Sequence, residues 1–171
     1  MSSSLWQTSL ATVLQTTKSE PPGRVAVLGV GQELRGDDAA GLAVIRALIQ
    51  GLPPTDNLLL LDTGPSPEAF TGSLRQFGPD WVLFVDAADM DAEPGAVAWV
   101  SDEAITGLSA STHTLPVSVM AKYMLAEFGC KIALLGIQPQ QTELDAPLSA
   151  PVTQAVAAVT AAFEQAITPR V

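Results

Sequence analysis

The sequence has little cysteine and little positive charge, and each shortage excludes a class of protein. One cysteine, Cys130, is present, so no disulfide can form within the chain, which fits a reducing cytoplasm. Eight Lys and Arg stand against 18 Asp and Glu, for a net charge of −10. Because no basic patch could neutralise phosphate groups, we expect no nucleic-acid partner.

Long apolar runs and nucleotide-binding loops are missing as well. No apolar stretch is long enough to span a bilayer, and residues 1–23 lack the basic start and unbroken apolar segment of a signal peptide. The loop GVGQEL lacks the third glycine of a dinucleotide-binding loop, and it carries no P-loop lysine–serine pair. We therefore expect no membrane partner, and a Rossmann-like nucleotide binder would lack its usual fingerprint.

What is present is an apolar chain with the alternating pattern of an α/β protein. Of its 171 residues, 47% are hydrophobic and 15% charged, which predicts a folded core. Apolar runs typical of buried strands alternate with segments of helical spacing. Strands are expected at residues 25–30, 57–62, 81–85, 95–100 and 131–138, and helices at residues 39–50, 67–76, 116–128 and 151–167.

This alternation predicts a three-layer α/β sandwich, with a mostly parallel five-stranded sheet and helices on both faces. The strand at 95–100 follows the third strand after a loop too short for a parallel crossover, so we expect an antiparallel edge strand. A loop with a helical turn is expected over residues 101–112.

The first 23 residues are expected to form an extension to a single domain at residues 24–171. The apolar residues of this extension have helical spacing and predict a short helix before Lys18, followed by a Pro-Pro-Gly linker. Whether this helix packs on the domain or forms a mobile tail is open at this point. The apolar residues are Trp6, Leu10, Val13 and Leu14.

The most informative stretch is residues 24–50, RVAVLGVGQELRGDDAAGLAVIRALIQ. It is typical of a buried strand, a glycine turn, and a loop with Asp37 and Asp38 that leads into a helix. Two carboxylates therefore follow the carboxyl end of a strand, which is where open α/β sheets bind ligands. Asp37 also has an ordinary interpretation as the N-cap of the following helix.

Three places along the chain could form one site. Besides Asp38, Asp86 ends the third strand with Asp89 close behind it, and His113 precedes a helix. Two carboxylates and a neutral imidazole make a three-ligand set that suits nickel, zinc or manganese. The alternatives are ordinary: Asp86 as a turn former, Asp89 as a loop acid and His113 as a surface or core residue.

Six short segments occur in the order found in the nickel-iron hydrogenase maturation endopeptidases: GVGQELRGDDAAG, LDTGPSPE, VDAADM, STHTLP, LLGIQP and LSAPV. From about residue 25 to 162 the chain resembles this family, especially the branch for formate-hydrogenlyase-type hydrogenase, hydrogenase 3. The resemblance implies a five-stranded twisted sheet flanked by helices. It also implies an aspartic-type or metal-dependent endopeptidase that removes a C-terminal extension from the large-subunit precursor after nickel insertion.

By the same resemblance, Asp38, Asp86 and His113 recognise nickel that the precursor already holds. The implied partner is thus the nickel-iron hydrogenase large-subunit precursor, and nickel arrives with it. Asp89 is expected to hold a neighbouring group in place. A chaperone that checks nickel loading without cutting is the alternative from another class.

Three positions depart from the family pattern: Gln32 stands for Asn, Ala39 for Gly, and Thr63-Gly64 for Gly-Gly. We expect Gln32 to keep an amide function and Ala39 to restrict the backbone beside Asp38.

Overall fold

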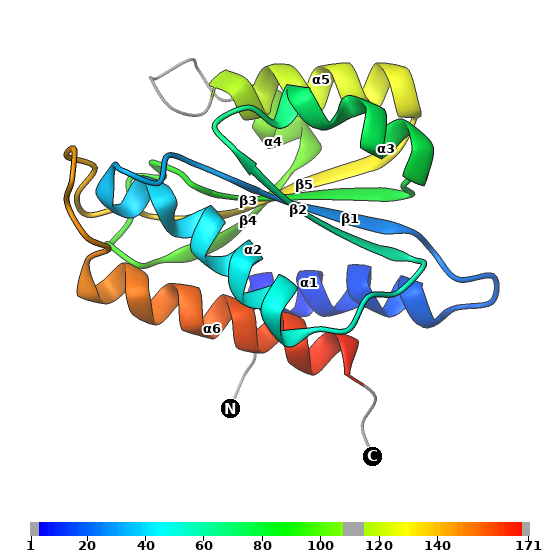
Figure 1. The fold of residues 1–171 in the computed structure, drawn as a ribbon, viewed down its shortest axis with the longest axis horizontal. Coiled ribbons are helices and arrows are strands. Elements are labelled where there is room, and N and C mark those ends of the chain that lie inside the picture. The colour runs from blue at the N-terminus through cyan, green and yellow to red at the C-terminus, as the bar shows by residue number, and fades with distance from the viewer. Residues whose placement is uncertain (1–3, 108–114, 169–171) are drawn as a thin grey trace.

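The computed structural model describes residues 4–107 and 115–168, and these build one five-stranded sheet (Figure 1). The strands are β1 (Val25–Val30), β2 (Leu58–Gly64), β3 (Trp81–Ala87), β4 (Val97–Ser101) and β5 (Lys131–Ile137). They lie in the order β2-β1-β3-β5-β4, and β4 pairs antiparallel with β5 while the other pairs are parallel. The predicted sheet with an antiparallel edge strand is therefore confirmed.

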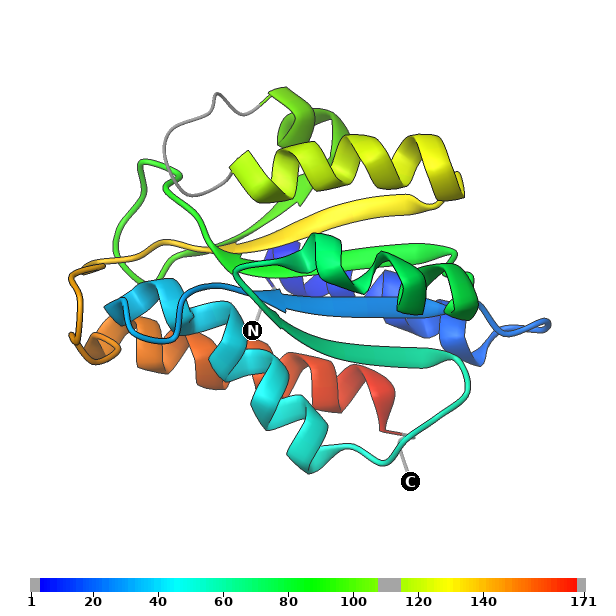
Figure 2. The same ribbon diagram turned by 45° about the horizontal axis from the view of Figure 1, so that its top comes forward.

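Helices cover both faces of the sheet, as Figures 1 and 2 show. One face carries α1 (Leu5–Gln15), α2 (Ala40–Gly51) and α6 (Ala150–Ile167), and the other carries α3 (Thr71–Phe77), α4 (Asp102–Gly107) and α5 (Leu115–Phe128). Short 3-10 turns are η1 (Thr16–Lys18), η2 (Gly36–Ala39) and η3 (Pro67–Phe70). The three-layer prediction is confirmed, and α4 is the helical turn expected within residues 101–112. None of the described helices combines the length and apolar composition needed to cross a membrane.

Successive side chains of each strand point to opposite faces of the sheet, and this divides the core into two halves. In β1, Val25 and Val27 pack with the α1, α2 and α6 layer, whereas Ala26 and Leu28 pack with the opposite layer. All six residues of β1 are buried, because the strand has neighbours on both sides and helices on both faces. The near-continuous apolar run in the sequence follows from this double burial.

The start of α2 lies unusually close to the sheet. A Cβ added at Gly41 would collide with the carbonyl oxygens of Val30 and Val85, at the ends of β1 and β3. One added at Gly29 in β1 would overlap the side chain of Ile45 in α2. These two glycines therefore let the helix that follows the acid pair begin directly against the strand ends.

Helix α1 is integrated into the core. Its residues Trp6, Leu10, Val13 and Leu14 are buried, and α1 packs against α6 and β4. Lys18, just after the helix, donates a 2.8 Å hydrogen bond from Nζ to the carbonyl oxygen of Ala166 in α6. The predicted helix is thus present, and the question of whether it packs on the rest of the chain is answered.

We predict that Leu14→Ala destabilises the whole protein by about 2–5 kcal/mol, because it leaves a cavity in a fully buried position. Leu14 is 0% exposed, whereas Leu5 on the same helix is 86% exposed. Leu5→Ala is therefore the matched control and should change stability by less than about 0.5 kcal/mol. Urea unfolding measures both variants, and a Leu14→Ala protein as stable as Leu5→Ala would contradict the integration of α1.

Candidate active site

The carboxyl edge of the sheet brings together two of the three predicted ligands. Asp86 lies near the end of β3, one residue after Val85, which pairs with Gly29 of β1. Asp38 lies in η2, just after the loop that leaves β1. Both are nearly buried, with 3% of Asp86 and 8% of Asp38 exposed. Adjacent parallel strands thus place the two acids at one edge, as the topology predicted.

The two carboxyl groups influence each other electrostatically. Burial, reinforced by the negative charge of Asp38, raises the pKa of Asp86 well above its ordinary value of 3.8. A hydrogen bond from the backbone N–H of Ala87 acts in the opposite direction but is the smallest of these effects. A buried carboxyl beside a second acid is best stabilised by a proton or by a cation that both acids share.

His113, the third predicted ligand, lies outside the described residues. Helix α5, which begins at Leu115, covers the sheet face on which Val82 and Phe84 of β3 pack. By the alternation of β3, Asp86 belongs to this same face. Figure 1 shows that α5 starts above the carboxyl edge of the sheet. Among the described residues, no group of three or more His, Cys, Asp or Glu could hold a metal ion.

Asp37 has a different role from its neighbour. Its carboxylate accepts hydrogen bonds from the backbone N–H groups of Ser149 (2.7 Å), Gln140 (2.8 Å) and Gln141 (3.0 Å), and from the Ser149 hydroxyl (2.8 Å). Burial alone would raise the pKa of Asp37, but these hydrogen bonds hold it below its ordinary value. Asp37 therefore ties the loop after β1 to the loop after β5.

The expectation that Asp37 caps its own helix is wrong. The N-cap of α2 is Ala39, which makes no side-chain hydrogen bond to the helix. Ser149 is the N-cap of α6, so the Asp37 carboxylate lies at the start of that other helix, where the helix dipole favours an anion. The Ser149 hydroxyl bonds Asp37 and leaves no side-chain cap on α6 itself.

Gln138 braces the loop that follows β3, a role that sequence reasoning missed. Its buried side chain accepts hydrogen bonds at Oε1 from the backbone N–H groups of Met90 (2.7 Å) and Ala92 (3.3 Å). Its Nε2 donates to Oδ1 of Asp89 at 3.3 Å. Asp89, an exposed residue of the same loop, also accepts a hydrogen bond from the backbone N–H of Asp91. Its carboxylate therefore takes part in bracing this loop. The segment LLGIQP contained Gln138, but nothing local to it indicated a partner.

The departures from the family pattern fit the local structure. Ala39 has φ −84° and ψ 1°, so its backbone lies on the negative-φ side and does not require glycine beside Asp38. Thr63 is buried, and its hydroxyl donates a 2.9 Å hydrogen bond to the carbonyl oxygen of Gly29, which joins β2 to β1. Gln32 is exposed, and its backbone N–H donates to the carbonyl oxygen of Asp38 at 3.2 Å.

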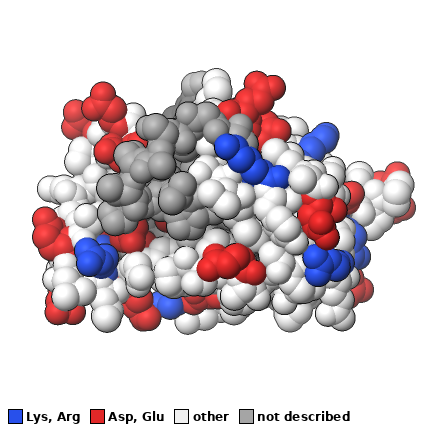
Figure 3. Space-filling view, turned by 90° about the horizontal axis from the view of Figure 1, so that it is seen from above, with Lys and Arg blue, Asp and Glu red and all other residues white. Residues whose placement is uncertain are grey.

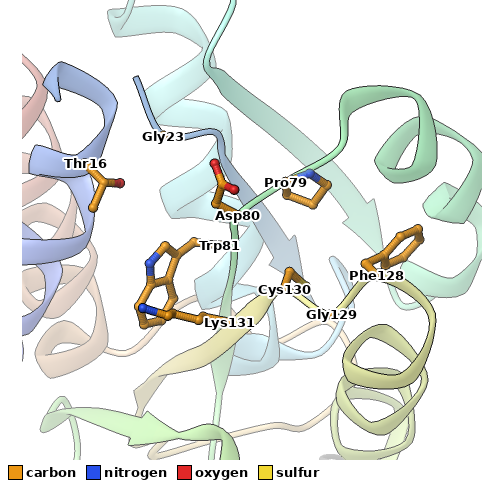
Figure 4. Close-up of a pocket in the computed structure, with 9 residues that line it drawn as sticks. All are labelled: Thr16, Gly23, Pro79, Asp80, Trp81, Phe128, Gly129, Cys130 and Lys131. Carbon is orange, nitrogen blue, oxygen red and sulfur yellow. The ribbon is translucent and has the colours of Figure 1, made fainter. Parts of the chain in front are cut away.

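A cavity of about 410 Å³ lies at the opposite, amino-terminal edge of the sheet (Figure 4). It contains none of the predicted site residues, and the one thiol beside it belongs to Cys130. Burial, with a smaller effect of Asp80, raises the pKa of Cys130, so its thiol is a poor nucleophile. The lining residues are Thr16, Gly23, Pro79, Asp80, Trp81, Phe128, Gly129, Cys130 and Lys131.

Comparison with known proteins assigns the class. A sequence profile of the hydrogenase maturation proteases matches residues 42–168, most of the chain. A crystal structure of the nickel-iron hydrogenase maturation protease HycI from Thermococcus kodakarensis has the same fold, with a TM-score of 0.79 and 29% identity over 91% of this chain and 98% of that one. The chain is therefore an α/β protease, and it belongs to the hydrogenase maturation protease family.

Individual relatives support the same family assignment. The hydrogenase 3 maturation protease of Escherichia coli is 29% identical over 134 residues, which cover 78% of this chain and 84% of that protein. A Methanocaldococcus jannaschii protein, itself named as a suggested hydrogenase maturation protease, is 36% identical over 68% of this chain and 73% of its own length. These relatives favour neither the non-cutting chaperone nor the nucleotide binder.

We predict that Asp37→Asn destabilises the fold near neutral pH by about 2–4 kcal/mol, because an amide nitrogen would face N–H donors that need an acceptor. The pKa of Asp37 in the folded protein lies below its ordinary value of 3.8. Its stabilising contribution is therefore present above that value and is lost as the pH falls through the lower, folded pKa. The difference between wild type and variant should shrink accordingly in acid.

Urea unfolding over a series of pH values measures this difference. Asp56→Asn, which removes an exposed acid, is the control and should leave the unfolding midpoint nearly unchanged throughout. An Asp37→Asn protein as stable as wild type near neutral pH would rule out the bracing role.

Asp86→Asn should have the opposite effect on stability. The pKa of Asp86 is raised in the folded protein, so the contribution of Asp86 to stability falls as the pH rises from 3.8 through the folded value. Asparagine does not titrate, so the free energy of unfolding of the variant should rise relative to that of the wild type as the pH rises through this range. The same urea series measures it; a constant difference between the two proteins at every pH would show that Asp86 titrates normally.

Proposed function

We propose that this chain removes a C-terminal extension from a nickel-iron hydrogenase large-subunit precursor after nickel has been inserted. Membership of the hydrogenase maturation proteases supports this, as does the site at the carboxyl edge of the sheet. The observation that carries the proposal is the buried pair Asp38 and Asp86. The two carboxylates repel each other when both are charged, and this repulsion favours binding of a cation at the site.

Asp38, Asp86 and His113 would then bind nickel that the precursor brings to the protease. Carboxylate oxygen and imidazole nitrogen are suitable nickel ligands, and three such ligands leave positions open for the precursor's own groups. Because ligands must be deprotonated, nickel would displace the proton that burial favours on Asp86. In this way the arrival of nickel with the precursor would convert Asp86 to the charged form that binds the metal.

Cleavage adds water across one amide bond and releases a new carboxyl terminus and an amine. We propose that this hydrolysis is metal-dependent: Asp38 and Asp86 would hold the nickel of the precursor, and the metal would supply Lewis-acid activation of the scissile carbonyl or of a water. An aspartic-type mechanism would use the same two carboxyl groups, with Asp86 as the protonated member at neutral pH. We place the reaction in the cytoplasm, where a buried free thiol such as Cys130 stays reduced.

The central experiment is mass spectrometry of the precursor after incubation with this protein, with nickel-loaded and nickel-free precursor in parallel. We expect loss of a C-terminal peptide from the nickel-loaded precursor only. Binding without any loss of mass would instead identify a non-cutting chaperone. Loss from both precursors would show cleavage without a nickel check.

His113→Ala should reduce processing of the nickel-loaded precursor by at least about 100-fold while the circular dichroism spectrum and unfolding midpoint stay unchanged. Asp56→Asn again serves as the control and should process the precursor like wild type. A fully active His113→Ala protein would remove His113 from the metal site.

A further inference from the structure

Two exposed leucines lie at the carboxyl edge of the sheet, on loops that meet. Leu34, between β1 and η2, is 61% exposed, and Leu144, between β5 and α6, is 63% exposed. The backbone N–H of Asp145 donates a 2.8 Å hydrogen bond to the carbonyl oxygen of Leu34, so the two loops are joined at this point. We refer to Leu34 and Leu144 as the leucine pair.

The loop that carries Leu34 is held in place on several sides. The N–H of Arg35 donates to the carbonyl oxygen of Gln32 at 3.2 Å, which closes a turn with Glu33 and Leu34 at its tip. Arg46 of α2 bonds Glu33 at 3.0 Å and also Asp62 at 2.7 Å. Turn tips usually carry polar or small residues, so turn formation does not account for a leucine there.

The loop that carries Leu144 is also attached to the rest of the fold. Its first residues are bonded to the buried carboxylate of Asp37 through the N–H groups of Gln140 and Gln141. Because both backbones are already ordered, an apolar group that binds the leucine pair would lose little free energy to ordering the loops. The pair thus has the properties of a preformed anchor point.

The leucine pair lies close in the chain to the acidic site. Leu34 lies four residues before Asp38, and the N–H of Asp38 donates to the carbonyl oxygen of Arg35 at 3.0 Å. Leu34 and Asp38 therefore lie on one short hydrogen-bonded segment, to which the loop of Leu144 is joined through the N–H of Asp145. A polypeptide that reached Asp38 would therefore pass close to the loop that carries Leu34.

Charge distinguishes between possible occupants. The two loops carry the exposed acids Glu33, Glu143 and Asp145 and the basic Arg35; because Glu33 is paired with Arg46, Glu143 and Asp145 give this surface its negative charge. A second copy of this chain, with a net charge of −10, would bring the same acids face to face. A segment with an apolar side chain and a neighbouring Lys or Arg has complementary charge.

We propose that the leucine pair docks an apolar side chain of the hydrogenase precursor, with a basic residue of the same segment against the acids around it. This inference rests on the proposed function and adds to it a surface that determines which polypeptide is accepted. Leu34 and Leu144 contribute binding, whereas Asp38, Asp86 and His113 act on nickel and the scissile bond.

The test uses the full-length protein with Leu34→Ser and Leu144→Ser combined. Ile49→Ser and Leu5→Ser are the matched controls, because both residues are exposed leucine or isoleucine side chains on helices outside these loops, at 47% and 86% exposure. Two quantities are measured: Kd for the nickel-free precursor, and KM and kcat for the nickel-loaded precursor. The double variant should raise both Kd and KM by about tenfold or more with little change in kcat.

The two measurements separate this inference from the proposed function. A double variant that binds the nickel-free precursor like wild type overturns the docking role even if cleavage proceeds normally. Wild-type binding that the double variant loses, without cleavage by either protein, supports docking and argues against the protease proposal. Failure of the wild type to bind the precursor overturns docking outright.

Crosslinking identifies the occupant. A photo-crosslinking residue at position 144 should capture the precursor within the segment that is cut, and the same residue at position 49 should not. Capture of a second copy of this chain from position 144 would replace the precursor by a homodimer as the occupant.

Discussion

The carboxylate of Asp37 joins parts of the chain that are far apart in sequence, and the architecture of the site depends on it. It accepts hydrogen bonds from residues 103 to 112 positions further along the chain. In this way it fixes the loop after β1, the loop after β5 and the start of α6 relative to one another. Without it, the segment that carries both Leu34 and Asp38 would have fewer attachments to the sheet.

Two buried acids at this edge of the sheet, Asp37 and Asp86, thus have opposite electrostatic environments. Hydrogen bonds hold the pKa of Asp37 down, and at the same edge burial beside Asp38 raises the pKa of Asp86. The first arrangement stabilises the folded protein, and the second destabilises it at neutral pH in the absence of a cation. A fold that retains an unfavourable buried acid at a ligand-binding edge is consistent with a functional requirement for it.

Figure 3 shows the outer face of α3, α4 and α5, where basic side chains lie singly among acidic ones.

Much of the fold could be predicted from the sequence because its signals are local. The bounds of β1 and the order of strands and helices follow from apolar runs and turn residues. The proximity of Asp38 and Asp86 follows from parallel topology. The roles of Asp37 and Gln138 could not be predicted, because their partners lie on other segments and their residue types suit many turns and caps. The ligand roles of Asp38, Asp86 and His113 stay predictions.

The packing of α1 on α6 has a consequence for synthesis of the protein. The first helix and the last helix share one core, and Lys18 bonds the carbonyl oxygen of Ala166 near the other end of the chain. During translation, the apolar face of α1 therefore leaves the ribosome long before its partner exists. We expect the core to close only after the last helix has emerged, so that a truncated chain exposes Trp6 and Leu10 and is prone to aggregate. The fold that holds the site would therefore become complete only after α6 has been synthesised.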